Sequence, residues 1–406
     1  MKEQWVYFLM GDADSNDPNI PAYSDLFLEE LSQACGFRVA NAPLEKVSQE
    51  LLPVFFIASG GAEEGFKAAY QLVAPPYVLL TTPSYNSLAA AMEIMGFLDE
   101  QGLSGEILHG SAQRIARRLT VLSRAAVAEK TIDCMRLGAI GKPSGLIASE
   151  ADPKVLKEAT GMEVVDLDLM ELVDEYKKGG YPENDWTRQL KAADFDVREV
   201  EQALDVYGAS CRMIERYKLD AVTVRCFELL KHIDTTGCLA LAILNAQGIP
   251  AACEGDTKSL VSMVILTAVT GQPSFMANPS SMDPDTGEII FAHCTLPLDM
   301  PDRYRLTTHF ETGIGVAVAG DLEPTLVTVM KCNESLSRWY VGTADLLESL
   351  GRPDLCRTQM RLKLHDGTHY FEHNPISNHH MICRGDWAEE LEEFFKRLQK
   401  KLHRKP

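Results

Sequence analysis

The sequence lacks the patterns that mark several common classes of protein. Its ten cysteines form no CxxC pair, and Gly60, Gly61 and Gly65 form no GxGxxG fingerprint of dinucleotide binding. Its longest apolar stretches, such as LVSMVILTAVTG, are too short to span a bilayer. Basic residues are fewer than acidic ones. The chain has 39 Lys and Arg and 58 Asp and Glu, which gives a net charge of −19. This acidity disfavours nucleic acid and anionic membrane surfaces as partners.

The composition is otherwise that of a soluble globular protein. Hydrophobic residues make up 46% and charged residues 24% of the 406 residues, and this length suggests two or three domains. Many cysteines lie in apolar runs, as Cys226 and Cys253 do, and we interpret them as small buried hydrophobic residues. The N-terminal segment turns acidic before any long apolar core. We therefore expect no signal peptide and a cytoplasmic protein.

Strand and helix patterns alternate in the first third of the chain. Short apolar runs at residues 5–10, 53–61 and 77–84 are typical of buried strands, and a helical pattern follows over 87–101. Such alternation predicts parallel βαβ units. A long helical pattern ends near residue 130, which is where we expect the first domain to end.

A second α/β pattern begins near Thr131 and later changes to hairpins. Strands are predicted at 162–168 and 220–226, whereas after Pro273 short strands are separated by turns. A final amphipathic helix is predicted over residues 386–402. The expected fold is α/β, with two Rossmann-like α/β domains followed by a β-rich, barrel-like domain, at residues 1–130, 131–290 and 291–406.

Histidines and carboxylates mark the last two-fifths of the chain as the place of a site. Seven of the ten histidines lie between His293 and His380. Glu254 and Asp256 follow a short apolar strand and precede a helix, which is where ligands bind in open α/β sheets. Asp256 also suits the N-cap of that helix. Glu254 precedes the cap, and we expect it to point into the crevice.

Three histidines beside apolar strands extend this candidate site. His293 lies at the end of one strand, and His379 and His380 precede another. Adjacent residues of a strand point to opposite faces, so one of the pair should enter a given pocket. Carboxylate and imidazole together suit a divalent cation of the manganese, iron or cobalt kind. The spacing therefore indicates a metal site in this part of the chain.

Several segments resemble the L-fucose and L-arabinose isomerases. ACEGDTKSLVSMVIL, which begins at Ala252, resembles the L-fucose isomerase segment in which Glu and then Asp precede a helix. FMAN, IIFAHCTLP, HFETGIGVAV and SNHHMI resemble the strands and the closing histidine motif that follow in this family. TTPSYNSLAAAMEI and LGAIGKPSGLIAS fit the N-terminal and middle domains of shorter L-fucose isomerase-like proteins. The resemblance covers nearly the whole chain.

This resemblance implies a metal-dependent aldose–ketose isomerase that acts on a small sugar through an enediol. It implies a divalent metal, above all Mn²⁺, as cofactor and a homotrimer or homohexamer as the assembly. The metal ligands implied by position are Glu254, Asn278, His293 and His380. The catalytic residues implied are Glu254, Asp256 and His379. The substrate-binding residues implied are Asn278, His309 and Glu311.

Asn278 is the main departure from the family pattern, because the fucose branch has an acidic ligand at this position. An amide coordinates a metal weakly and accepts no proton at neutral pH. A non-catalytic sugar-binding or regulatory protein on the same scaffold is therefore the alternative. A dinucleotide-dependent enzyme is a third interpretation, against which the missing glycine fingerprint argues. The pattern does not identify the sugar.

Overall fold

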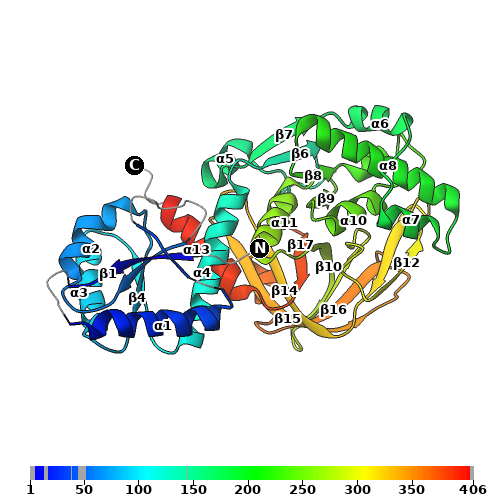
Figure 1. Cartoon of the computed structure of the whole chain (residues 1–406). Helices are drawn as coiled ribbons and strands as arrows, with labels where there is room; N and C mark the ends of the chain where they lie inside the picture. Colours follow the sequence, from blue (N-terminus) through cyan, green and yellow to red (C-terminus); the bar gives the residue numbers. More distant parts are fainter. Residues whose placement is uncertain (1–4, 13–16, 38, 44–51, 144, 403–406) are drawn as a thin grey trace. The chain divides into compact units, whose positions relative to one another are not determined.

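The computed structural model describes residues 5–402, except for residues 13–16, 38, 44–51 and 144. Contacts divide the chain into two compact units, Met1–Lys130 and Thr131–Pro406, and each is described by itself. They contain two parallel sheets and a closed six-stranded barrel (Figure 1), which confirms the predicted α/β class with a barrel-like C-terminal part. No helix in the described ranges is both long and apolar enough to cross a bilayer.

The first unit is a parallel sheet with helices on both faces. Its strands are β1 (Trp5–Met10), β2 (Ala40–Asn41), β3 (Leu52–Ile57), β4 (Tyr77–Thr81) and β5 (Gly105–Leu108), in the order β2-β1-β3-β4-β5. Its helices are α1 (Asn19–Cys35), α2 (Glu63–Ala69), the 3₁₀ helix η2 (Tyr70–Leu72), α3 (Ser87–Glu100) and α4 (Ala112–Ile132). Because neighbouring strand residues face opposite sides, Phe56 packs with α1 and α4, whereas Phe55 packs with α2 and α3.

The second unit begins with another parallel sheet. Its strands are β6 (Arg136–Ile140), β7 (Glu163–Leu167), β8 (Ala221–Val224) and β9 (Ala251–Cys253), in the order β7-β6-β8-β9. Its helices are α5 (Pro153–Thr160), α6 (Leu169–Lys177), α7 (Asp185–Lys191), α8 (Val197–Tyr217), α9 (Cys226–Leu229), α10 (Cys238–Ala246) and α11 (Thr257–Thr270). Every residue of β8 and β9 is buried, as strands covered on both faces require.

Six antiparallel strands close the barrel of the second unit. They are β10 (Phe275–Asp283), β11 (Glu288–His293), β14 (Thr325–Cys332), β15 (Trp339–Ser349), β16 (Thr358–Leu364) and β17 (His380–Arg384), in the ring order β10-β11-β16-β15-β14-β17. The ribbon β12 (Arg303–Thr307) and β13 (Ala317–Asp321) and the helices α12 (His369–His373) and α13 (Ala388–Leu402) accompany them. Closure leaves none of the six strands with an unpaired edge.

The barrel begins earlier than the sequence predicted. Strand β10 starts at Phe275, close to the change of pattern at Pro273, and it pairs with β11 and β17. The predicted boundary at residue 290 falls inside β11. Because the two strands of a hairpin share their hydrogen bonds, such a boundary would divide one folding element. Strand β10 and all of β11 therefore belong to the barrel.

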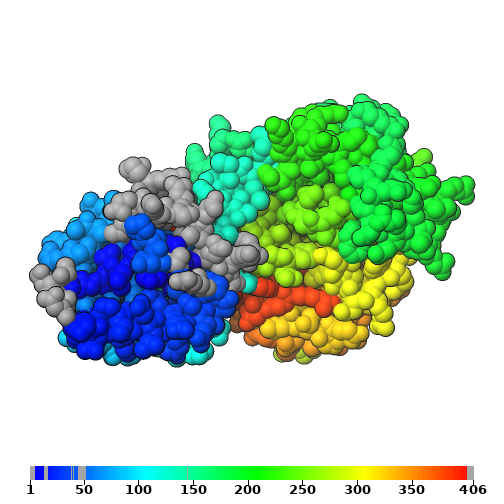
Figure 2. All heavy atoms as spheres, viewed as in Figure 1, coloured from blue at the N-terminus to red at the C-terminus, as the bar shows by residue number. Residues whose placement is uncertain are grey.

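Helix α11 connects the middle sheet to the barrel. It packs against β8 and β9 of the sheet and against β14 and β17 of the barrel, and Figure 1 shows it between them. All but two of its 14 residues are buried, as expected of a helix with apolar neighbours on several sides. In Figure 2 the green surface of the middle part of the chain lies in direct contact with the yellow surface of the segments that follow. The end of β9 is thereby placed beside the barrel.

A buried carboxylate holds helices α6 and α8 together. Glu175 is 2% exposed and accepts hydrogen bonds from Lys178 at 2.7 Å and from Arg212 at 3.0 Å. Arg216 also donates to it, and Arg212 donates in addition to the carbonyl oxygens of Glu175 and Gly180. These cations, Lys178 above all, lower the pKa of Glu175 to about 2 although burial opposes the shift.

We expect Glu175→Gln to lower the free energy of unfolding at pH 7 by roughly 1–3 kcal/mol. The loss should be smaller than for a fully buried ion pair, because the arginine partners of Glu175 are partly exposed. Since the folded-state pKa lies below the ordinary 4.5, this stabilisation is complete above that pH and disappears as the pH falls toward 2. Denaturant titrations at several pH values measure it. Asp174→Asn is the control, because its pair with Lys177 is exposed. Equal effects of the two substitutions would contradict the assignment.

Candidate metal centre

Three segments far apart in the sequence bring one carboxylate and two imidazoles together. Glu254 follows β9, His293 ends β11, and His379 immediately precedes β17. The Nε2 atoms of His293 and His379 each lie 3.6 Å from Oε1 of Glu254. In the described part of the chain, these three side chains form the group of His, Cys, Asp or Glu whose ligand atoms all lie within 4.8 Å of one another.

The backbone turns sharply at Glu254, directly after β9. Glu254 has a φ of 64° and Gly255 a φ of 68°, both in the left-handed region. A Cβ at residue 255 would also lie 2.8 Å from the carbonyl oxygen of Lys142, so glycine is required there for two reasons. For Glu254 the left-handed conformation costs about 1–2 kcal/mol. Backbone strain of this size is typical of functional positions.

Asp256 fixes the orientation of His379. Nδ1 of His379 donates to Oδ2 of Asp256 at 2.9 Å, because a carboxylate only accepts, and Nε2 is left facing Glu254. The backbone N–H and the hydroxyl of Ser259 also donate to Asp256, which is the N-cap of α11. Asp256 is fully buried, and both of its oxygens are engaged. It therefore supports His379 and does not line the cavity described below.

A fully buried lysine completes this network. Nζ of Lys331, on β14, donates to Oγ of Ser259 at 2.8 Å. Burial lowers the pKa of Lys331, and the negative charge of Asp256 opposes that shift. Burial has the opposite effect on a carboxylate and raises the pKa of Asp256. The contacts with Lys331 and His379 outweigh burial and hold that pKa well below its usual range. The buried carboxylate is thus compensated by a cation on one side and an imidazole on the other.

A hydroxyl orients His293 in the same way. Nδ1 of His293 lies 3.1 Å from Oγ1 of Thr295, so that Nε2 faces Glu254. Burial raises the pKa of Glu254, yet the contacts of His293 and His379 outweigh it and hold that pKa well below its usual range. Glu254 is therefore an anionic carboxylate that faces two ring nitrogens, each with its second nitrogen engaged elsewhere.

This donor set fits a divalent cation. Two ligands that each lie about 2.1 Å from one ion are about 3–3.5 Å apart, close to the 3.6 Å from each Nε2 to Oε1 of Glu254. Metal-binding histidines also engage their second nitrogen with a carboxylate or another polar group. His379 and His293 do so through Asp256 and Thr295. One carboxylate and two imidazoles suit manganese, iron, cobalt or zinc.

Glu254 and His293 line a cavity of about 60 Å³ between the end of the middle sheet and the barrel. The other residues that line it are Cys226, Phe227, Leu230, Thr236, Cys238, Cys253, Asn278, Cys294, His309, Glu311 and Cys356. Pockets for small molecules commonly measure about 300–1,000 Å³. At about 60 Å³, this cavity is smaller than that range.

The three predicted substrate-binding residues reach this cavity from two elements. Asn278 lies on β10, and its Oδ1 accepts a hydrogen bond from Asn378 at 2.8 Å. His309 and Glu311 lie in the loop between β12 and β13. Burial lowers the pKa of His309, which favours its neutral form, whereas Glu311 is exposed. All three line the same cavity as Glu254, and their roles stay predictions.

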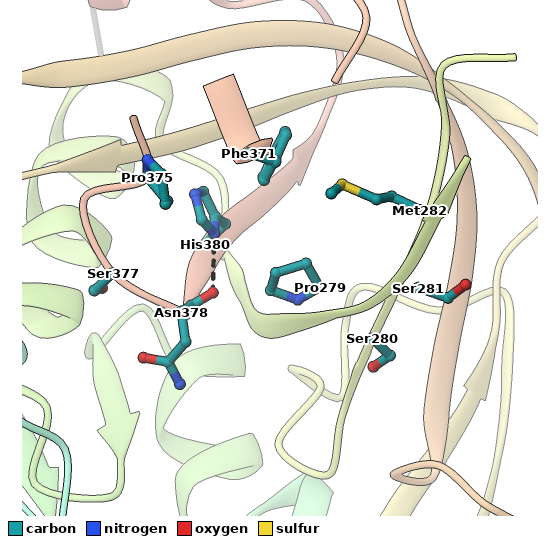
Figure 3. Close-up of a pocket in the computed structure, with 9 residues that line it drawn as sticks. All are labelled: Pro279, Ser280, Ser281, Met282, Phe371, Pro375, Ser377, Asn378 and His380. Carbon is teal, nitrogen blue, oxygen red and sulfur yellow. Dashed lines mark hydrogen bonds between the residues drawn. The ribbon is translucent and has the colours of Figure 1, made fainter. Parts of the chain in front are cut away.

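His380 lies outside this group, contrary to the sequence prediction. Its Nδ1 donates to the carbonyl oxygen of Asn378 at 3.0 Å, and its Nε2 lies 3.1 Å from the hydroxyl of Tyr370. It lines a separate pocket of about 430 Å³, shown in Figure 3. Burial above all lowers the pKa of His380 to about 3, so the ring is neutral. One member of the pair does face the site, as strand geometry requires, but it is His379.

Two features of the site lie outside the sequence predictions. Lys331 is the first, although a lysine inside the apolar run TLVTVMKC is a signal of a buried charge that needs a partner. The second is the position of the cysteines, because five of these small, mostly buried residues line the cavity. Two of these, Cys253 and Cys294, directly adjoin Glu254 and His293 in the sequence. That adjacency was the available signal.

Comparison with known proteins gives distant relatives. No protein-family model matches the chain. A sulfoquinovose isomerase from Priestia megaterium is 23% identical over 192 residues, which cover 45% of this chain and 42% of that protein. One from Alkalicoccus urumqiensis is 24% identical over 221 residues, which cover 52% and 49%. One from a Clostridium species is 25% identical over 192 residues, which cover 45% and 42%.

The chain spans about half the length of the curated relatives it matches. These alignments show a distant similarity to proteins named as isomerases of sulfoquinovose. These relatives and the family of the motif resemblance are both named as isomerases of sugars, although of different sugars.

Proposed function

We propose that this chain is a metal-dependent aldose–ketose isomerase that acts on a small sugar through an enediol. The convergence of Glu254, His293 and His379 beside a cavity is the observation that carries this proposal. The relatives named sulfoquinovose isomerase and the resemblance to L-fucose isomerases support the same type of reaction. In this reaction a hydrogen moves between two adjacent carbons of the sugar.

Glu254, His293 and His379 are the residues that would hold the metal, and we assign Mn²⁺ to them. A bound divalent ion polarises the carbonyl and hydroxyl oxygens of a sugar, which makes the hydrogen on the adjacent carbon easier to remove. Three protein ligands are the number found in catalytic sites that keep positions open for substrate. Asp256 and Thr295 fix the two imidazoles in the orientation that this role requires.

Proton transfer needs a base at one carbon and an acid at its neighbour. Two carboxylates line the cavity in the described part of the chain, Glu254 and Glu311. Oε1 of Glu254 faces the two histidines, so Oε2 is the oxygen left for a substrate proton. We assign the second proton position to Glu311. Asp256 and His379 are the other two residues predicted to be catalytic. In this proposal Asp256 orients His379, and His379 binds the metal, so neither transfers a proton.

The substrate class in this proposal is a small sugar, and sulfoquinovose is the first to test because the relatives are named for it. The cavity of about 60 Å³ takes the reacting end. The remainder of the sugar extends past His309 and Glu311. In the homotrimer or homohexamer that the resemblance implies, a neighbouring subunit would complete the pocket there.

A non-catalytic sugar-binding or regulatory protein on the same scaffold is the second candidate, and Asn278 favours it. Its amide lines the cavity at the position where the resemblance expects an acid, and its oxygen already accepts a hydrogen bond from Asn378. An amide oxygen carries no full charge and accepts no proton at neutral pH. The two candidates therefore differ in turnover rather than in sugar binding.

We expect the protein to bind Mn²⁺ and His379→Asn to weaken that binding by about tenfold or more, because the substitution removes a nitrogen ligand. His380→Asn is the matched control, since His380 is adjacent, equally buried and outside the group. It should keep the wild-type affinity. Calorimetric titration of metal-stripped protein gives the affinities, and circular dichroism verifies that both variants are folded. Equal losses in the two variants would contradict the ligand assignment.

We expect the Mn²⁺-loaded protein to interconvert an aldose and its ketose, tested first with sulfoquinovose, L-fucose and L-arabinose. In D₂O the ketose product should carry deuterium at carbon 1, because the proton that the enediol route removes from carbon 2 exchanges with solvent before a proton is returned to carbon 1; NMR detects it. Glu311→Gln should lower turnover by about 10²-fold or more and leave Mn²⁺ binding unchanged. Turnover without deuterium would contradict an enediol route with solvent exchange, and metal binding without turnover of any sugar would favour the second candidate.

We expect Asn278→Asp to tighten Mn²⁺ binding by roughly tenfold, because it restores a negative charge beside Glu254. Ser280→Asp is the control, since it adds the same charge to an exposed position two residues along β10, outside the cavity. Competition titration with a fluorescent metal indicator compares the two. An equal gain in both variants would show a general charge effect and refute a specific role for residue 278.

A further inference from the structure

Five cysteines gather at the wall of the cavity, and the proposed isomerase reaction uses none of them. They are Cys226, Cys238, Cys253, Cys294 and Cys356, and all are free thiols. Two of them are in direct contact, because Sγ of Cys226 lies 2.7 Å from Sγ of Cys253. This pair also lies directly beside the candidate metal centre, since Cys253 precedes Glu254 in the chain.

The backbone brings these two sulfurs together at the ends of adjacent parallel strands. Cys253 ends β9 and pairs with Val224, the last residue of β8, and Cys226 follows two residues later at the start of α9. The S–S bond of a disulfide is about 2.05 Å long, so the sulfurs need to approach by only about 0.65 Å from their separation of 2.7 Å. The two sulfurs therefore lie close to bonding distance at the ends of two neighbouring strands.

We propose that Cys226 and Cys253 are an oxidation site, at which a small two-electron oxidant of the peroxide class forms a disulfide in the folded protein. Both side chains are mostly buried, at 8% and 4% exposure. Both line the cavity, and the cavity gives a small oxidant its approach to the sulfurs. A molecule of the size of hydrogen peroxide fits its volume of about 60 Å³.

The chemistry balances with hydrogen peroxide as the oxidant. One thiol gives up its proton, and its thiolate attacks a peroxide oxygen; this breaks the O–O bond and gives a sulfenic acid, and the hydroxide released takes up the proton as one water. The second thiol then attacks the oxidised sulfur, forms the S–S bond and releases a second water. In total the two thiols lose two protons and two electrons, and the peroxide is reduced to two waters. A dithiol reductant reverses the change by thiol–disulfide exchange.

Disulfide formation also acts on the metal centre through Glu254. The left-handed φ of 64° at Glu254 leaves its backbone little freedom to absorb a shift of Cys253. Movement of the Cys253 side chain toward Cys226 is therefore passed on to the carboxylate that faces His293 and His379. The oxidised protein accordingly binds a divalent metal more weakly. This consequence rests on the proposed metal site, whereas the disulfide itself does not.

The test treats the folded, reduced full-length protein with hydrogen peroxide and then blocks the remaining thiols with an alkylating reagent. A non-reducing digest analysed by mass spectrometry should contain the Cys226 and Cys253 peptides linked and lighter by two hydrogens. Cys226→Ala should lose this link. Cys134→Ala is the matched control, because it removes an exposed cysteine outside the cavity, and it should keep the link.

A Mn²⁺ titration of the oxidised protein should show about tenfold weaker binding, restored by dithiothreitol. In Cys226→Ala, peroxide should leave the affinity unchanged. If Cys226 and Cys253 stay reduced or pair with other cysteines, the oxidation site is refuted whatever the metal result. A Cys226–Cys253 link with unchanged affinity refutes the coupling to Glu254. If the reduced protein binds no Mn²⁺, the proposed metal site fails and the digest alone decides the oxidation site.

Discussion

The burial of two carboxylates at the start of α11 is the constraint on which the rest of the site depends. Glu254 and Asp256 are separated by a single glycine, and neither can stay charged inside the protein without partners. The barrel provides them, because His293, His379 and Lys331 all lie on its strands or beside their ends. The middle sheet thus contributes the negative charge and the barrel the groups that compensate it, and α11 packs against both.

The parts of this arrangement that the sequence predicted are those with local signals. Glu254 and His293 each adjoin a short apolar strand, and Asp256 stands where a helix N-cap is expected. The choice between His379 and His380 has no local signal. It depends on the register of β17 against β10, in which Ala277 pairs with His380, and a shift of one residue would exchange the two faces.

Contacts between segments that are distant in the chain could not be predicted from the sequence. The bond from His379 to Asp256 spans 123 residues, and the contact between Cys226 and Cys253 depends on β8 and β9 being neighbours. The early start of the barrel also depends on pairing between distant segments. The residues of β10 are typical of a strand whichever sheet that strand joins. Only its pairing with β11 and β17 places it in the barrel.

The position of β17 in the ring has a consequence for the order of folding. This last strand closes the barrel by pairing with β10 on one side and β14 on the other, and it follows His379 directly. Contacts between segments this far apart form slowly, because a long loop must close first. The three candidate ligands therefore meet only when the final strand docks. An ion that needs all three stabilises the completed barrel and none of its precursors.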